Sequence, residues 1–122
     1  MHGEVVLLQK TYDFYKKYYQ FLDHFPKKAK FVLAVKIEQT ILDLLQDMAN
    51  AKWAREETKI LLLKNASKNI DLLKILFRLC WELRIMNQDK YIEFEKDILE
   101  MGRMTGGWIK KPNAPPENGA LE

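Results

Sequence analysis

The sequence contains one cysteine and two histidines among 122 residues, so it has few of the side chains that bind metals or form disulfides. A single thiol excludes a disulfide framework and a cysteine metal site within one chain. Cys80 lies in the apolar run KILFRLCWEL, and we expect it to be a buried, unreactive thiol in a cytoplasmic protein. No stretch approaches about 20 uninterrupted apolar residues, and the N-terminus lacks the order of a signal peptide, so no membrane association is predicted.

The constellations that catalysis requires are also missing. Neither His2 nor His24 has a ligand-like partner three or four residues away, and the Glu-x-x-His motifs of di-iron bundles are absent. The stretch GRMTGG lacks the Lys-Ser/Thr and the preceding strand of a phosphate-binding loop. Acids at helical spacing are expected on solvated faces: Asp43, Asp47, Glu93 and Asp97. We therefore predict no enzyme activity, metal, cofactor or small-molecule substrate.

Apolar residues instead recur at helical spacing in four segments, and no segment alternates as a strand does. The predicted helices span residues 4–23, 26–55, 59–85 and 87–111. Pro26 separates the first two, and Asn87 is the expected N-cap of the fourth, with Asp89 in its first turn. Short connections favour an antiparallel up-down-up-down four-helix bundle over residues 1–111. Residues 112–122 are rich in Pro, Asn and Gly, and we predict a disordered tail there.

Each helix is expected to bury one apolar face. In the first helix this face comprises Val5, Leu8, Tyr12, Tyr15, Tyr19 and Leu22, and Phe14, Tyr18 and Phe21 widen it. In the second helix it comprises Phe31, Val35, Leu42, Leu45 and Ala49, with a neighbouring stripe of Ile37, Ile41, Leu44 and Met48. In the fourth helix it comprises Tyr91, Phe94, Ile98, Met101, Thr105 and Trp108.

The third helix is apolar around roughly 200° of its circumference, whereas a surface helix needs little more than 100°. Two explanations remain open. Either this helix is the most central of the four, or its surplus face, with Leu72, Ile75 and Leu79, contacts another copy of the protein.

The segment EMGRMTGGWIKKPNAPP carries three of the five glycines beside a tryptophan. Gly102 and Gly106 lie one turn apart, where missing side chains would let another backbone approach and let Trp108 lie against a partner. This contact could form within the bundle or between subunits. A frayed helix end with a Gly-Gly cap is the alternative.

The net charge is +3, and the positive excess lies between residues 27 and 86. This distribution permits a polyanionic partner without requiring one. Arg78 and Arg103 lie among apolar residues, where a planar guanidinium suits carboxylate or phosphate, although a structural role is an equal alternative. Ordinary solubilising charge is the alternative for each lysine. The remaining candidate binding residues are Lys27, Lys28, Lys30, Lys64, Lys68, Lys74, Lys96, Lys110 and Lys111.

Three stretches carry a family resemblance: HFPKKAKFVLAVKIEQTILDLL, IDLLKILFRLCWELRIMNQDKY and MGRMTGGWIK. Between about residues 12 and 110 the chain resembles the accessory variability determinant (Avd) proteins of diversity-generating retroelements. The wider superfamily includes four-helix proteins encoded by intervening sequences of bacterial 23S ribosomal RNA genes. Those share the FPKKAKF stretch but follow it with Ser-Ile-Pro and Ala-Glu-Gly patterns, whereas this chain has TILDLLQDMANAKW.

The resemblance implies a four-helix bundle that assembles into a homopentameric barrel. It also implies binding to a reverse transcriptase and to RNA, with DNA as a further partner, in support of mutagenic cDNA synthesis and retrohoming. Arg78 in LFRLCW and Arg103 in MGRMTGG match family arginines by position, and Thr105 departs from the usual larger apolar residue. The alternative is a self-associating protein scaffold of the intervening-sequence type, without a nucleic-acid role.

Overall fold

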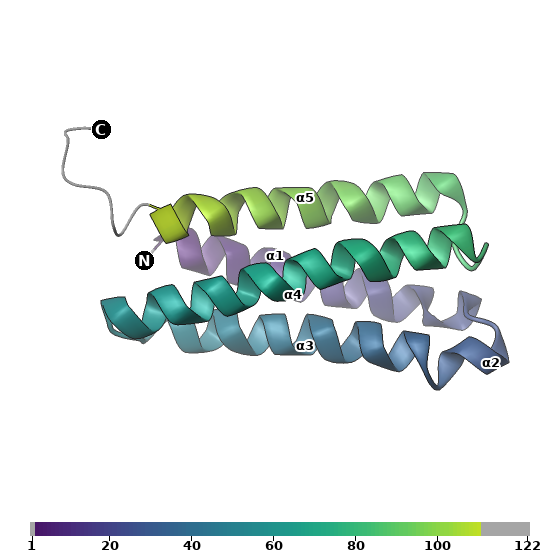
Figure 1. Cartoon of the computed structure of the whole chain (residues 1–122), viewed down its shortest axis with the longest axis horizontal. Coiled ribbons are helices and arrows are strands. Elements are labelled where there is room, and N and C mark those ends of the chain that lie inside the picture. The colour runs from purple at the N-terminus through teal and green to yellow at the C-terminus, as the bar shows by residue number, and fades with distance from the viewer. Residues whose placement is uncertain (1, 111–122) are drawn as a thin grey trace.

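Helical periodicity dominates the fold of this chain (Figure 1). The computed structural model describes the backbone of residues 2–110 and the side chains of residues 5–109. Within that range the chain is all helical, with four long helices and no strand. In chain order the elements are α1 (His2–Phe21), η1 (Leu22–His24), α2 (Lys27–Lys30), α3 (Leu33–Ala51), α4 (Glu56–Glu82) and α5 (Gln88–Lys110). The predicted disordered tail lies outside the described residues.

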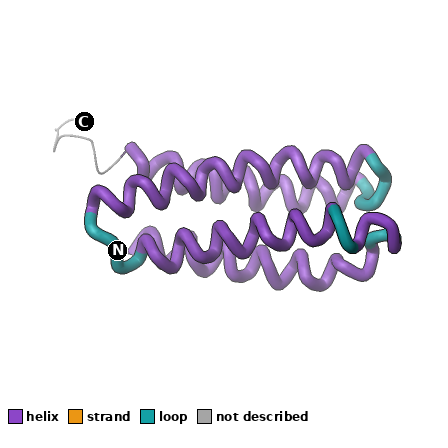
Figure 2. Tube along the Cα trace, turned by 60° about the horizontal axis from the view of Figure 1, so that its bottom comes forward, coloured by secondary structure: helices purple, strands orange, loops and turns teal. Residues whose placement is uncertain are grey.

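Each long helix runs antiparallel to the one before it, and turns join them at the two ends of the bundle (Figure 2). Helix α1 packs against α3 and α5, and α4 packs against the same two helices. Helices α1 and α4 therefore occupy opposite corners of the bundle. The antiparallel four-helix prediction is confirmed for a single chain.

The single helix predicted for residues 26–55 is wrong, because the chain breaks between α2 and α3. Val32 has φ −122° and ψ −75°, outside the helical region. Phe25 fills the end of the core against Tyr18, and the Tyr18 hydroxyl donates a hydrogen bond to the carbonyl oxygen of Ala34 at 2.6 Å. The chain must turn after α2 so that Ala34 lies over Tyr18.

The turn between α4 and α5 follows the predicted signals. The Ile85 amide donates to the carbonyl oxygen of Cys80 and the Arg84 amide donates to that of Trp81, which is the bond pair of a Schellman helix end. Arg84 takes the left-handed position of this turn, with φ 62°. Asn87 caps α5 as expected, because its Oδ1 accepts a hydrogen bond from the Lys90 amide at 2.8 Å.

Three phenylalanine rings occupy the middle of the core, one each from α1, α4 and α5. The ring centroids of Phe14, Phe77 and Phe94 lie 4.9 to 5.6 Å apart. Tyr18 and Phe21 extend this cluster toward the end where α2 lies. Aromatic pairs at these distances contribute about 0.5–1.5 kcal/mol each beyond the area they bury.

The rotations predicted for α1 and α3 are wrong by part of a turn. In α1 the buried stripe is Leu7, Thr11, Phe14, Tyr18 and Phe21, whereas Tyr12 and Tyr19 are exposed. In α3 the neighbouring stripe of Ile37, Ile41, Leu44 and Met48 forms the core, whereas Phe31, Val35 and Leu42 are exposed. The seam of α5 is confirmed, since Phe94, Ile98, Met101 and Thr105 are buried.

Helix α4 is too apolar for its own bundle to cover. One side is buried and includes Cys80, whose thiol pKa burial raises to about 12, as expected of an unreactive group. On the other side Leu61 is 68% exposed and Ile75 is 60% exposed. Packing of α4 against both α3 and α5 therefore does not account for the exposure of Leu61 and Ile75.

The left-handed conformation of Arg84 generates a stability prediction. Such a conformation costs roughly 1–2 kcal/mol for a residue with a Cβ, and glycine avoids that cost. Arg84→Gly is expected to raise the free energy of unfolding by about 1 kcal/mol after the extra freedom of the unfolded chain is subtracted. Urea denaturation measures this change. Arg84→Ala is the control and should leave stability near that of the wild type; a destabilised glycine variant would contradict the prediction.

Candidate functional site

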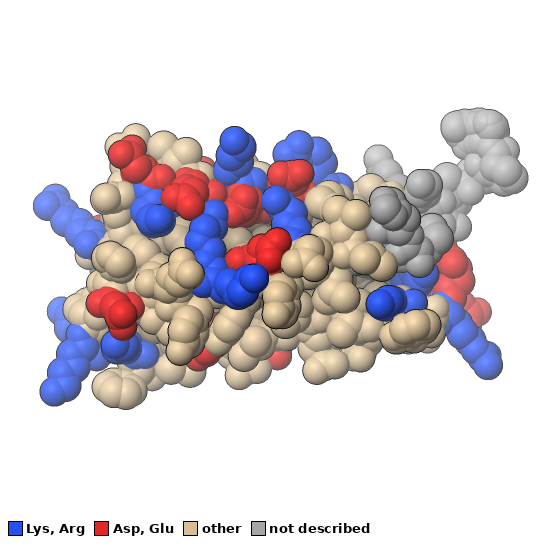
Figure 3. Space-filling view, turned by 180° about the vertical axis from the view of Figure 1, so that it is seen from behind, with Lys and Arg blue, Asp and Glu red and all other residues tan. Residues whose placement is uncertain are grey.

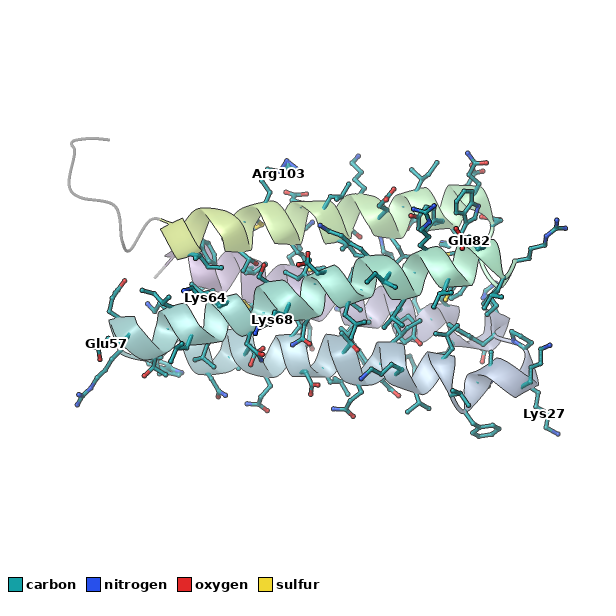
Figure 4. The ribbon with its side chains drawn as sticks, in the orientation of Figure 1. Lys27, Glu57, Lys64, Lys68, Glu82 and Arg103 are labelled. Carbon is teal, nitrogen blue, oxygen red and sulfur yellow. The ribbon has the colours of Figure 1, made fainter. Side chains whose placement is uncertain are left out.

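The outer side of α5 carries cations that face solvent. Lys96 and Arg103 are seven residues apart and lie opposite the buried stripe of Phe94, Ile98 and Met101. Arg103 makes no hydrogen bond or ion pair with any residue that the structure describes. Its side chain points away from the bundle (Figure 4). The side chain of Lys110 and all of Lys111, also predicted to bind, lie outside the described residues.

The basic residues of α4 form a second group, and acids partly neutralise it. Lys64 and Lys68 are exposed on the face that Figure 4 presents to the viewer. Lys74 pairs with Asp71 at 3.5 Å. Arg78 donates through Nε to Oε2 of Glu82 at 2.9 Å, and this carboxylate raises the pKa of Arg78.

The third predicted group lies at one end of the molecule. Lys27 and Lys28 are exposed on α2, and Lys30 pairs loosely with Asp23 at 3.9 Å. Figure 4 places Lys27 at the far end of the bundle from Lys64. The structure therefore distributes the predicted cations over three separate surfaces and does not bring them together in one patch.

Ion pairs neutralise the seam between α1 and α5. Lys17 bonds to Asp97 and lies 3.2 Å from Glu93, and Lys10 lies 3.3 Å from Glu100. Hydrogen bonds from Lys90 and Lys17 lower the pKa of the Glu93 carboxyl. Figure 3 shows red and blue side chains interspersed along this seam. Its lysines are therefore poorly placed for phosphate binding.

Asp47 is a buried carboxylate that the sequence interpretation assigned, wrongly, to a solvated face. Asp47 lies between α3 and α4 and is only 8% exposed. Its Oδ2 accepts hydrogen bonds from the side-chain amides of Asn65 and Asn69, at 2.9 and 3.4 Å. Burial raises its pKa, and the two amide donors oppose that effect. The two amides thereby satisfy the Oδ2 atom of this carboxylate at the α3–α4 contact.

The glycines of α5 are not needed for packing within the chain. A Cβ added to Gly102 would lie 3.5 Å from Cγ2 of Ile70, an ordinary contact, and one added to Gly106 would meet nothing within 4 Å. Close approach of another backbone inside the described bundle is therefore excluded at both positions. Trp108 is half-buried against the core, and Thr105 is buried with its hydroxyl donating to the Met101 carbonyl oxygen.

Exposed apolar side chains form a stripe on α4 and a second group on α1 and α3, and Ile92 and Leu99 are exposed on α5. The first, here called the α4 face, consists of the exposed Leu61, Ile75, Leu79 and Leu83 and the half-buried Leu72, with Lys64 and Lys68 between Leu61 and Leu72. The second, the α1–α3 face, consists of Val5, Tyr12, Tyr19, Val35 and Leu42. Figure 3 shows that few charged side chains interrupt the surface below the α1–α5 seam. Exposed apolar surface of this extent commonly marks a contact site.

The sequence interpretation had placed the α1–α3 face in the core. A signal for it was present, because α1 and α3 each carry two adjacent apolar stripes and a bundle helix buries only one. No helix in the described range is long and apolar enough to cross a membrane. That range also contains no group of three or more His, Cys, Asp or Glu side chains able to hold a metal ion.

The fold and these surfaces define a helical-bundle protein whose distinguishing features lie on its exterior. Residues 5–112 match the bAvd-like family model, and the chain belongs to that family. No curated protein matches the sequence. A solved structure from Bacteroides thetaiotaomicron, a protein of unknown function from the S23 ribosomal protein family, is similar in fold, with a TM-score of 0.81. It shares 17% identity and covers 88% of this chain and 98% of its own; neither comparison indicates a catalytic family.

The buried Asp47 generates a pH-dependent prediction. Because burial raises its pKa in the folded state, its protonated form favours folding. This contribution is present below the unfolded pKa of about 3.9 and is lost as pH rises through the higher folded value. The Asp47→Asn variant cannot titrate at this position, so it does not lose this contribution. As pH rises through the interval, the free energy of unfolding of the variant should therefore increase relative to that of the wild type, and above the interval the difference should stay constant. Urea denaturation across pH measures the difference, and a gain for the wild type would contradict the prediction.

Proposed function

We propose that this protein is a non-enzymatic accessory subunit of a diversity-generating retroelement. In this role a homo-oligomer binds the reverse transcriptase and RNA and supports mutagenic cDNA synthesis and retrohoming. The match of residues 5–112 to the bAvd-like family carries the proposal. The polymerase chemistry would belong to the transcriptase, and this chain would contribute binding and placement.

The cations of the outer surface support a polyanionic partner. Lys96 and Arg103 on α5 are exposed and, among the described residues, lack the acidic partners that neutralise the α1–α5 seam. Lys64 and Lys68 are exposed as well, but their helical spacing places them on the same side of α4 as Leu61 and Leu72, so a subunit contact on the α4 face would cover them. Phosphate contacts would supply affinity with little sequence preference. Arg78 also remains a candidate phosphate-binding residue, because its ion pair with Glu82 is exposed, and exposed ion pairs are weak and exchange partners readily.

The two apolar faces support self-association. They lie on different helices and differ in composition, since the α4 face is aliphatic and the α1–α3 face includes two tyrosines. A twofold dimer joins identical patches, whereas contact between two different patches generates a ring or a filament. Joining the α4 face of one subunit to the α1–α3 face of the next would form a ring, in keeping with the expected pentamer. The glycines at 102 and 106 would then leave room for a neighbouring subunit on α5.

A self-associating scaffold without nucleic acid is the second candidate function. The fold likeness to the S23-family protein and the same apolar faces are compatible with it. RNA binding separates the two candidates, because a scaffold needs only the apolar faces.

Variants of the two faces test the ring. Ile75→Glu on the α4 face and Tyr19→Glu on the α1–α3 face would each bury an unpaired carboxylate at the contact, so each should be a monomer. Each variant keeps one intact face, so an equal mixture should form a species of twice the 14.5 kDa chain mass. Sedimentation equilibrium measures these masses. Lys96→Glu also introduces a carboxylate, but outside both faces, and should leave the oligomer intact. A mixture that stays monomeric would contradict the pairing of unlike faces.

Arg103→Ala tests the cationic surface. The wild type should lose RNA affinity steeply as salt rises, by roughly the 0.7 to 0.9 power of salt concentration for each phosphate contact. Arg103→Ala should weaken binding and reduce that slope by about one contact while the fold stays intact. Lys10→Ala, which removes a charge from the neutralised α1–α5 seam, is the matched control. An RNA affinity that is insensitive to salt would sink the nucleic-acid role, and an unfolded Arg103→Ala would make Arg103 structural.

A further inference from the structure

The short helix α2 presents an exposed aromatic ring beside two cations. Phe31 ends α2 and is 74% exposed, the highest exposed fraction of any phenylalanine in the described chain. Lys27 and Lys28 precede it by four and three residues. Phe31 keeps helical φ and ψ of −95° and −1°, so these lysines lie on its side of the turn. We call Lys27, Lys28 and Phe31 the α2 tip.

The Phe31 ring is not needed to fill the core. The end of the core is already filled by Phe25, which packs edge-on against Tyr18 and Phe21 and is 5% exposed. The break at Val32 then turns Phe31 outward, although its neighbours in sequence follow an apolar pattern. The ring is therefore surplus to folding within this chain.

The charges around the ring are nearly all positive. Helix α2 has no acid in its first turn, and Lys27 and Lys28 form no ion pair with any residue in the described range. Lys30 is the exception, with Asp23 at 3.9 Å. Figure 3, in which this end lies at the left, shows blue side chains projecting beyond the body of the molecule.

We propose that the α2 tip binds single-stranded RNA, with an unpaired base stacked on the Phe31 ring and Lys27 and Lys28 contacting the flanking phosphates. An aromatic face beside cations is the arrangement that single-stranded nucleic acids recognise, because each nucleotide supplies both a flat base and a negative charge. This inference rests on the proposed RNA-binding function and deepens it. It assigns part of the RNA binding to the α2 tip, which would contact unpaired nucleotides.

Two other occupants fit less well. A second copy of the chain would be expected on the long sides of the bundle, where the apolar faces lie, whereas the α2 tip is at the end of the long axis (Figure 4). A membrane surface would need a wider apolar area than Phe31 and the adjoining Val32 provide. Charge complementarity with RNA therefore favours a nucleotide at this position.

Equilibrium binding of oligouridine and of a matched strand lacking bases tests the inference. The wild type should bind the oligouridine more tightly. Phe31→Leu keeps apolar bulk but cannot stack, so it should lose roughly 5- to 100-fold in oligouridine affinity and leave binding of the base-free strand unchanged. Phe31→Tyr keeps an aromatic ring at this position and should bind oligouridine as tightly as the wild type does. Lys28→Gln should instead weaken both strands and reduce the salt slope by about 0.7.

Trp53→Ala is the matched control, because Trp53 is an 83% exposed aromatic with Lys52 over its ring at 5.2 Å, in the turn between α3 and α4. It should bind oligouridine as the wild type does. Wild-type protein that binds no RNA at all defeats the proposed function itself. RNA binding that Phe31→Leu leaves intact defeats this inference alone. A changed oligomer mass in Phe31→Leu, or Phe31-dependent binding to phosphatidylserine vesicles, would also overturn it by assigning the ring to another occupant.

Discussion

The cluster of Phe14, Phe77 and Phe94 determines how three of the four long helices are rotated about their axes. Once these rings meet at 4.9 to 5.6 Å, the side of each helix that faces outward is fixed as well. The α4 face and the α1–α3 face are what this rotation leaves outside. Core packing and surface chemistry are therefore two results of the same contact, and changes to the rings would alter both.

Much of the fold could be predicted from the sequence. The 3.6-residue periodicity located the four long helices, and Asn87 marked the start of α5 through a cap that the structure confirms. The rotations of α1 and α3 could not be predicted, because Tyr12 and Phe14, or Val35 and Ile37, belong to apolar stripes of similar quality on one helix. Only tertiary packing against the other helices chooses between such stripes. The break at Val32 has the same origin, since it depends on where Phe25 and Tyr18 meet.

The candidate site was predictable in residue type but not in arrangement. Sequence spacing placed Lys96 and Arg103 on one side of α5 and gave Arg78 a similar status. It could not show that Glu82 pairs with Arg78, or that Lys10 and Lys17 are neutralised across a seam by acids about 80 to 90 residues away. Pairing across helices decides which cations remain available to a ligand. Phe31 illustrates the opposite error, because an apolar residue expected in the core is the most exposed phenylalanine of the described chain and lies beside two lysines.

The proposed self-association would connect the exposed apolar faces to the exposed cations, since a ring would cover the apolar faces and gather the cations from every subunit. Sedimentation equilibrium of the wild-type chain, over a range of protein concentrations, tests this link most directly. We expect a species of several times the 14.5 kDa chain mass, and a pentamer in particular. A single 14.5 kDa species across the whole range would contradict it, because both apolar faces would then be left open to water.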